Sequence, residues 1–130
     1  MDKQIYFVLG GPGSGKGTFC EQLAMRFPGK VDHFSAGDLL RAFLKNNGQG
    51  ETNPQRLEEL KVVRHCIEEG QIVPAEITTN LLFDAINKSK VAYILIDGFP
   101  RNEDNLVTWN KIHAAYPHIR LKGMLFLKCA

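Results

Sequence analysis

The chain lacks the residue patterns of disulfide-bonded and metal-bound proteins. Its three cysteines, Cys20, Cys66 and Cys129, lie far apart and include no C-x-x-C pair, so the sequence predicts neither a disulfide framework nor a zinc site. The four histidines show no metal-ligand spacing either. Such cysteine usage is typical of a reducing compartment, and we expect a cytoplasmic protein.

Long apolar runs and strong charge are lacking as well. No segment approaches the roughly 20 apolar residues of a membrane-spanning helix, and residues 1–10 do not resemble a secretion signal. The formal net charge is only +2, with no basic stripe for phosphate contacts, so we expect neither a nucleic-acid nor a membrane partner. A chain of 130 residues that is 44% hydrophobic and 23% charged is predicted to form one domain, residues 1–130.

Strand-like and helix-like patterns alternate along this domain. The apolar stretches 4–10 and 91–98 predict buried strands, and shorter strands are predicted at 31–35 and around 123–128. Helical spacing with proline or glycine boundaries predicts five helices, at 18–27, 37–48, 54–70, 74–89 and 102–117. The alternation predicts an α/β fold with a parallel sheet, in which ligands bind at the carboxyl ends of the strands.

The stretch "LGGPGSGKGT" stands where the first predicted strand meets the first helix. Glycines allow a tight turn whose backbone N–H groups converge on an anion, which the positive end of the following helix also favours. Gly10 to Lys16 match the phosphate-loop pattern G-x-x-x-x-G-K, and Lys16 can reach the outer phosphates of a nucleotide. The hydroxyl expected next comes one residue late, at Thr18. The alternative is a glycine-rich turn that binds nothing.

Three further residues are candidates because of their positions. Asp97 ends a buried strand, where a carboxylate either helps to hold a hydrated Mg²⁺ ion or caps a turn. Arg101 follows a proline and either stabilises phosphate charge or lies on the surface. Arg41 either clamps a second phosphate or belongs to a solvated helix face.

Four motifs then occur in an order that resembles the nucleoside monophosphate kinases, the adenylate kinase and UMP-CMP kinase group. They are GGPGSGKGT, SAGDLLR, EEGQIVPAEIT and IDGFPRN. The stretch "DGFPRNEDNLVTWN" is similar to the UMP-CMP kinase branch, whereas adenylate kinases commonly carry glutamine at the position of Asn105. The resemblance implies a P-loop NTPase fold in which an acceptor-binding helical segment spans about 35–73.

The resemblance also implies a reaction and a set of site residues. The γ-phosphate of ATP, with Mg²⁺, passes to CMP or UMP, or to AMP if the chain is closer to adenylate kinase. Lys16, Arg41 and Arg101 match catalytic residues, and Asp97 (through water) and Thr18 match the metal site. The loop around the donor phosphates matches Gly13, Ser14, Gly15, Lys16, Gly17 and Thr18. The acceptor site matches Ser35, Ala36, Gly37, Arg41, Gln71, Ile72, Val73, Gly98, Phe99, Pro100, Arg101 and Asn105.

The resemblance covers the part of the family domain that precedes its lid and final strand. Family members continue with an arginine-bearing lid, which supplies further positive charge around the transferred phosphate. The 130 residues therefore represent either a fragment of a longer kinase, monomeric when its domain is complete, or a short form that binds nucleotide with weak or no catalysis. Both alternatives stay open.

Overall fold

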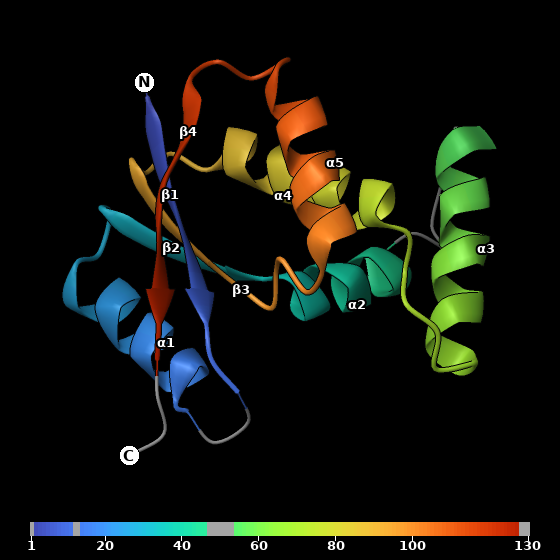
Figure 1. Cartoon of the computed structure of the whole chain (residues 1–130), viewed down its shortest axis with the longest axis horizontal. Helices are drawn as coiled ribbons and strands as arrows, with labels where there is room; N and C mark the ends of the chain where they lie inside the picture. The colour runs from blue at the N-terminus through green and yellow to red at the C-terminus, as the bar shows by residue number, and fades with distance from the viewer. Residues whose placement is uncertain (1, 12–13, 47–53, 128–130) are drawn as a thin grey trace.

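The computed structural model describes residues 2–11, 14–46 and 54–127 (Figure 1). Strands and helices alternate over most of the chain, as predicted. The strands are β1 (Lys3–Leu9), β2 (Val31–Ser35), β3 (Tyr93–Asp97) and β4 (Ile119–Phe126), and the helices are α1 (Lys16–Arg26), α2 (Ala36–Asn46), α3 (Pro54–Glu68), α4 (Ala75–Lys88) and α5 (Glu103–His113). The predicted α/β fold class is confirmed.

The four strands form one sheet in the order β2-β3-β1-β4, and all three neighbouring pairs are parallel. Because β1 and β3 are central, their carboxyl ends meet in the middle of one sheet edge, where Val8 pairs with Asp97. Ser35 at the end of β2 pairs with the same aspartate. The residues that follow these strands are thereby gathered at one edge, where ligands bind in parallel α/β sheets.

The two faces of the sheet are covered by different helices (Figure 1). Alternate residues such as Phe7 and Ile96 pack beneath α4 and α5 with Phe83 and Trp109, all fully buried or nearly so. Val8 and Leu95 point to the opposite face and pack against Cys20 of α1. A smaller apolar cluster, which includes the fully buried Val63, joins α2, α3 and α4, and through it α3 packs against other helices.

The start of β1 is fixed by a buried lysine. The ammonium of Lys3 donates hydrogen bonds to the backbone carbonyls of Ser89 and, at 3.0 Å, of Val91. Because only 5% of Lys3 is exposed, these carbonyls replace the water that the charge would otherwise require. The contact ties the first strand to the segment between α4 and β3.

Two predicted boundaries near the end of the chain are wrong. Helix α5 ends at His113 instead of continuing to residue 117, and β4 begins at Ile119 instead of near residue 123. Ile119 is fully buried and pairs with Lys3, so pairing with β1 makes this strand begin earlier than predicted. Among the described residues, no helix combines the length and apolar character needed to cross a bilayer.

Candidate functional site

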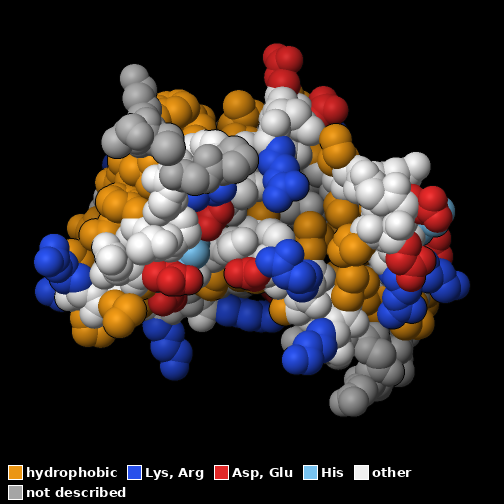
Figure 2. Space-filling model, turned by 90° about the horizontal axis from the view of Figure 1, so that it is seen from below, with side chains coloured by type: hydrophobic (Ala, Val, Ile, Leu, Met, Phe, Trp, Pro, Cys, Tyr) orange, Lys and Arg blue, Asp and Glu red, His pale blue; other side chains and the backbone are white. Residues whose placement is uncertain are grey.

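The candidate site lies at the edge of the sheet where the parallel strands end. Figure 2 shows this side of the molecule, with basic and acidic side chains around a hollow and a histidine visible among them. The loop after β1, the segment after β3 and the start of α2 all converge here. Parallel pairing therefore collects residues that are separated by 60 positions or more, as Ser35 and Asp97 illustrate.

The glycine-rich turn has close backbone contacts that explain its composition. A Cβ atom on Gly10 would lie 2.5 Å from Ser14 Oγ and 3.0 Å from the Leu127 carbonyl oxygen, so a side chain there would force the loop to move. Gly15 has φ +79°, in the left-handed region that glycine adopts without strain, and it stands at the N-cap of α1. The predicted donor-loop residue Gly13 lies outside the described residues.

The beginning of α1 offers its backbone N–H groups to a ligand. Its N-cap residue has no side chain to accept from them, and its first turn contains no acidic residue. The first N–H groups of a helix have no partner within the helix, and the helix dipole favours an anion there. Ser14 Oγ is also buried without a hydrogen-bond partner in the described structure. These features fit the phosphate chain of a nucleotide.

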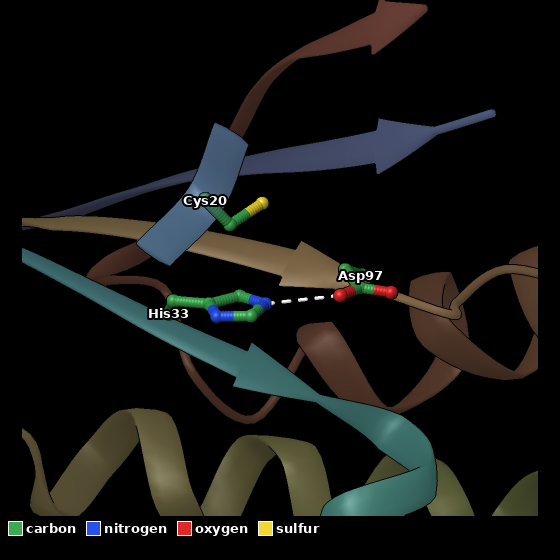
Figure 3. Close-up of side chains that lie close together, drawn as sticks. All are labelled: Cys20, His33 and Asp97. Atoms are coloured by element: carbon green, nitrogen blue, oxygen red, sulfur yellow. Dashed lines mark hydrogen bonds and ion pairs between the residues drawn. The ribbon is translucent and has the colours of Figure 1, made fainter. Parts of the chain in front are cut away.

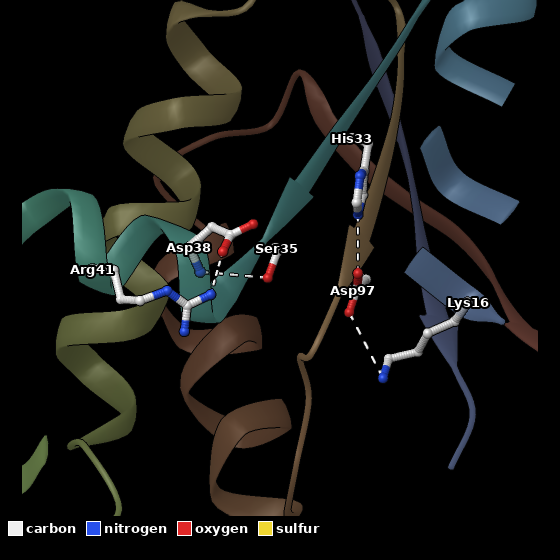
Figure 4. Close-up of polar contacts among 6 residues, drawn as sticks. All are labelled: Lys16, His33, Ser35, Asp38, Arg41 and Asp97. Carbon is white, nitrogen blue, oxygen red and sulfur yellow. Dashed lines mark hydrogen bonds and ion pairs between the residues drawn. The ribbon is translucent and has the colours of Figure 1, made fainter. Parts of the chain in front are cut away.

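Asp97 is the centre of the charged contacts at this edge (Figures 3 and 4). Its Oδ1 atom lies 3.9 Å from Lys16 Nζ, and its Oδ2 atom lies 3.0 Å from His33 Nε2. Only 13% of the Asp97 side chain is exposed, so these two partners stabilise a carboxylate that water reaches poorly. Lys16 is more accessible, with 30% of its side chain exposed. Thr18, the other predicted metal residue, is exposed in the first turn of α1.

The histidine beside Asp97 belongs to a cluster of three possible metal ligands that the spacing of histidines in the sequence does not indicate. Cys20, His33 and Asp97 come from α1, β2 and β3, and their ligand atoms all lie within 4.8 Å of one another. The alternation of side chains along β2 and β3 could predict part of this cluster, because His33 and Asp97 both lie on the face of the sheet that packs against α1. The spacing of residues in the sequence could not predict that Cys20 joins them, because its position depends on how α1 packs against the sheet.

The Cys20 thiol is strongly influenced by this environment. The pKa of Cys20 is raised from 9.0 to about 11, chiefly by burial and also by the negative charge of Asp97, while the positive charge of Lys16 opposes the shift. The side chain is fully buried. At neutral pH Cys20 is therefore a protonated thiol and a poor nucleophile.

A pocket of about 380 Å³ adjoins the charged cluster on the side of α2 and α3. The predicted residues that line it are Ala36, Gly37, Arg41, Gln71, Ile72, Val73, Gly98, Phe99, Arg101 and Asn105. Ser35 and Pro100, which were also predicted, are not among its lining residues. Leu40, Ile67, Gly70 and Thr78 line it as well and were missed by the sequence analysis.

The two predicted phosphate-binding arginines both border this pocket but are held differently. Arg41 forms an ion pair with Asp38 one helical turn away and is 69% exposed, so its guanidinium can reorient toward a ligand (Figure 4). Ser35 Oγ accepts a 3.4 Å hydrogen bond from the Asp38 backbone N–H at the start of the same helix. Arg101 donates from Nε to the Gly98 carbonyl at 3.1 Å, which anchors it at the pocket rim.

Two asparagines after β3 have different contacts. Asn102 caps α5, because its Oδ1 atom accepts a 3.0 Å hydrogen bond from the Asn105 backbone N–H. Asn105 Oδ1 accepts a 2.8 Å hydrogen bond from the Arg101 backbone N–H. An amide side chain can offer a base both a donor and an acceptor, but the acceptor atom of Asn105 already has a partner within the protein.

A second hollow, of about 550 Å³, runs along α1 between Phe19 and Arg26. Its lining is mostly apolar and shares no residue with the charged cluster. We therefore place the candidate site at the sheet edge and not at this larger hollow.

The glycine-rich loop between the first strand and helix, followed by Lys16, defines the chain as a P-loop α/β protein. The family model described as adenylate kinase matches residues 8–130, and the chain belongs to this family.

Curated relatives agree with this assignment. The chain is 41% identical to UMP-CMP kinase 3 of Oryza sativa over 97% of its own length and 53% of that protein. It is 44% identical to UMP-CMP kinase of Gallus gallus (85% and 54%) and 43% identical to uridylate kinase of Saccharomyces cerevisiae (96% and 55%). The chain thus spans about half the length of these relatives.

Proposed function

We propose that this chain is the nucleotide-binding part of a kinase that transfers the γ-phosphate of ATP to CMP or UMP. One observation carries the proposal: Asp97, which contacts Lys16, is followed directly by Gly98, which lines the 380 Å³ pocket. The phosphate-binding loop and a nucleotide-sized pocket therefore lie next to each other at the carboxyl end of β3. The relatives named UMP-CMP kinase and uridylate kinase support a pyrimidine acceptor.

In this proposal the donor ATP is held by the loop and by Lys16. The backbone N–H groups at the start of α1 face its phosphates, and the Lys16 ammonium follows the γ-phosphoryl group during transfer. Asp97 and Thr18 are the residues that would hold a hydrated Mg²⁺ ion, whose charge neutralises the phosphate oxygens when it is bound. The buried, partnerless Ser14 Oγ fits the same use of the loop.

The acceptor monophosphate enters the pocket, with its phosphate between Arg41 and Arg101. Arg101 is anchored to Gly98 at the rim, whereas Arg41 must leave Asp38 to make this contact. Two guanidinium groups can bind a phosphate through several charge-assisted hydrogen bonds and hold it in line with the donor. The helical segment of about 35–73 then forms the wall over the acceptor.

The base of the acceptor lies beside Asn105, Gln71, Ile72 and Val73. Because Asn105 Oδ1 binds the Arg101 backbone, we assign base recognition mainly to its amide nitrogen. An N–H donor suits the carbonyl oxygen that cytosine and uracil have in common. Ile72 is 76% exposed, and packing against a base would reduce this exposure.

The reaction requires no nucleophile from the protein. The acceptor phosphate attacks the γ-phosphorus of ATP, and the bond to the ADP leaving oxygen breaks, which yields two diphosphates. The protein contributes position and positive charge. An alternative is nucleotide binding without turnover.

The test is to incubate the purified chain with ATP, Mg²⁺ and either CMP, UMP or AMP, and to measure diphosphates by ion-exchange chromatography and binding by calorimetry. We expect tighter binding of CMP and UMP than of AMP, with diphosphates formed from the preferred acceptors. Binding without diphosphates would support the non-catalytic alternative for this chain. Preference for AMP would contradict the pyrimidine assignment and favour adenylate kinase activity.

Asn105→Gln provides the matched test of base recognition. We expect it to weaken CMP and UMP binding about tenfold, the loss of roughly one hydrogen bond, while ATP binding changes little. Equal losses for donor and acceptor would show that the variant disturbs the fold around Arg101 and does not act through the base.

A further inference from the structure

We propose that Cys20, His33 and Asp97 form a binding site for a thiophilic divalent cation such as Zn²⁺, which shares only Asp97 with the site for the nucleotide's magnesium. The three ligand atoms come from three elements and all lie within 4.8 Å of one another (Figure 3). The proposal does not depend on the kinase reaction, since it concerns only these three side chains.

The donor set selects the metal. One sulfur, one imidazole nitrogen and one carboxylate oxygen are ligands that Zn²⁺ accepts together, whereas Mg²⁺ takes oxygen ligands and avoids sulfur. Three protein ligands leave the fourth tetrahedral position to a water molecule. The chemistry of the cluster therefore favours Zn²⁺ over Mg²⁺.

The geometry requires only a small adjustment. With metal–ligand bonds of about 2.0–2.3 Å, ligand atoms of a tetrahedral site lie roughly 3.3–3.6 Å apart. His33 Nε2 and Asp97 Oδ2 are 3.0 Å apart and must separate slightly, while the widest separation in the cluster, up to 4.8 Å, must shrink by about 1.2–1.5 Å. Rotation of the side chains about their χ angles can supply movements of this size.

The two oxygens of Asp97 keep the proposed site apart from the phosphate site. Oδ2 faces His33, whereas Oδ1 faces Lys16, on the side where the hydrated Mg²⁺ ion of the proposed reaction would lie (Figure 4). The thiophilic cation is therefore expected on the Oδ2 side, between Cys20 and His33. Low exposure of all three side chains (0% for Cys20, 15% for His33 and 13% for Asp97) shields the site from competing water.

Binding has a definite proton balance. As the metal–sulfur bond forms, the Cys20 thiol releases its proton to the solvent, and neutral His33 binds the metal through Nε2. The hydrogen bond between His33 and Asp97 is replaced by two metal bonds. No electron is transferred, because Zn²⁺ is redox-inactive.

The test is to titrate the metal-free chain with Co²⁺, a coloured probe for zinc sites, under reducing conditions. We expect one Co²⁺ per chain with a thiolate-to-cobalt absorption band, and displacement of the band by Zn²⁺. Cys20→Ser should abolish the band, and His33→Gln should weaken Co²⁺ binding at least about tenfold. A Cys66→Ala/Cys129→Ala double variant is the matched control and should retain the band.

Folding of each variant is checked by circular dichroism, and the melting temperature with and without Zn²⁺ gives a second readout. Zn²⁺ should raise the melting temperature of the unaltered chain and of the double variant more than that of Cys20→Ser. If the folded chain gives no thiolate band, or if the band persists in folded Cys20→Ser, the proposal is wrong. If Cys20→Ser does not fold, the result for His33→Gln decides: undiminished Co²⁺ affinity overturns the site.

Discussion

Two lysines near opposite ends of β1 show how differently the protein uses the same side chain. Lys3 is 5% exposed and donates hydrogen bonds to the Ser89 and Val91 carbonyls. Lys16 has 30% of its side chain exposed, and its nearest charged partner, Asp97, is 3.9 Å away, beyond hydrogen-bond distance. The first is committed to the fold, whereas the second retains donors for a ligand. The sheet thus has a structural end and a binding end.

The largest expected effect comes from removing the charge at the binding end. Lys16→Met should weaken ATP binding about 10- to 100-fold, because charge-assisted hydrogen bonds to phosphate are worth about 1.5–3 kcal/mol. The free energy of unfolding should change by less than about 1 kcal/mol, as for other partly exposed ion pairs. Calorimetric titration with ATP and urea unfolding measure the two quantities.

Lys122→Met is the control for this variant, because Lys122 is exposed on β4 and lies beside the middle of β1, not at the carboxyl ends of the strands. It removes one positive charge without touching the site and should leave ATP affinity nearly unchanged. If Lys122→Met weakens ATP binding as much as Lys16→Met, bulk charge and not local contact governs the affinity.

The reverse result is expected at the structural end. Lys3→Met should lower the free energy of unfolding by about 1.5–3 kcal/mol, because the two carbonyls lose their charged donor. The apolar stem of methionine can still fill the buried space. ATP affinity of the folded protein should stay within about twofold, which calorimetry well below the melting temperature can establish. A loss of ATP affinity without a loss of stability would break the distinction between the two ends.

Much of the binding end could be predicted from the sequence because it depends on local patterns. The order of strand, glycines, Lys16 and helix defines the loop, and parallel pairing then carries Asp97 to its side. The pocket could be predicted through the resemblance, since its walls are short contiguous segments. Ten of the predicted acceptor residues line it, although Ser35 and Pro100 do not.

The remainder depends on contacts between distant segments that no local pattern records. Cys20 lies close to His33 only because α1 packs against the sheet at one particular position along the strands. In the sequence, Lys3 resembles an exposed residue at the start of a strand. Only the folded structure places the backbone carbonyls that follow α4 beside it. The start of β4 was missed for the same reason, because pairing with β1 and not intrinsic preference draws Ile119 into the sheet.

A smaller effect is expected from the asparagines after β3, which repeat the contrast between the two lysines. Asn102→Ala removes the cap of α5 and should cost about 1 kcal/mol of unfolding free energy, with nucleotide affinities preserved. Asn102→Asp keeps an oxygen acceptor and should restore most of the stability. Urea unfolding with both variants measures the difference. Should Asn102→Asp be as unstable as Asn102→Ala, the capping contact would not explain the loss.

The effect that is smallest at neutral pH concerns the buried thiol between the sheet and α1, because it appears only at alkaline pH. Burial raises the pKa of Cys20 from 9.0 to about 11, so the unfolded chain loses this proton at lower pH than the folded chain. The thiol's contribution to stability is therefore complete below pH 9 and declines as the pH rises toward 11. Unfolding free energies of the unaltered chain and of Cys20→Ala should converge over this interval. The measurement is urea unfolding in the presence of a chelator, which removes any bound cation. Cys66→Ala should run parallel to the unaltered chain, and a constant gap between the unaltered chain and Cys20→Ala would show that folding does not perturb the Cys20 proton.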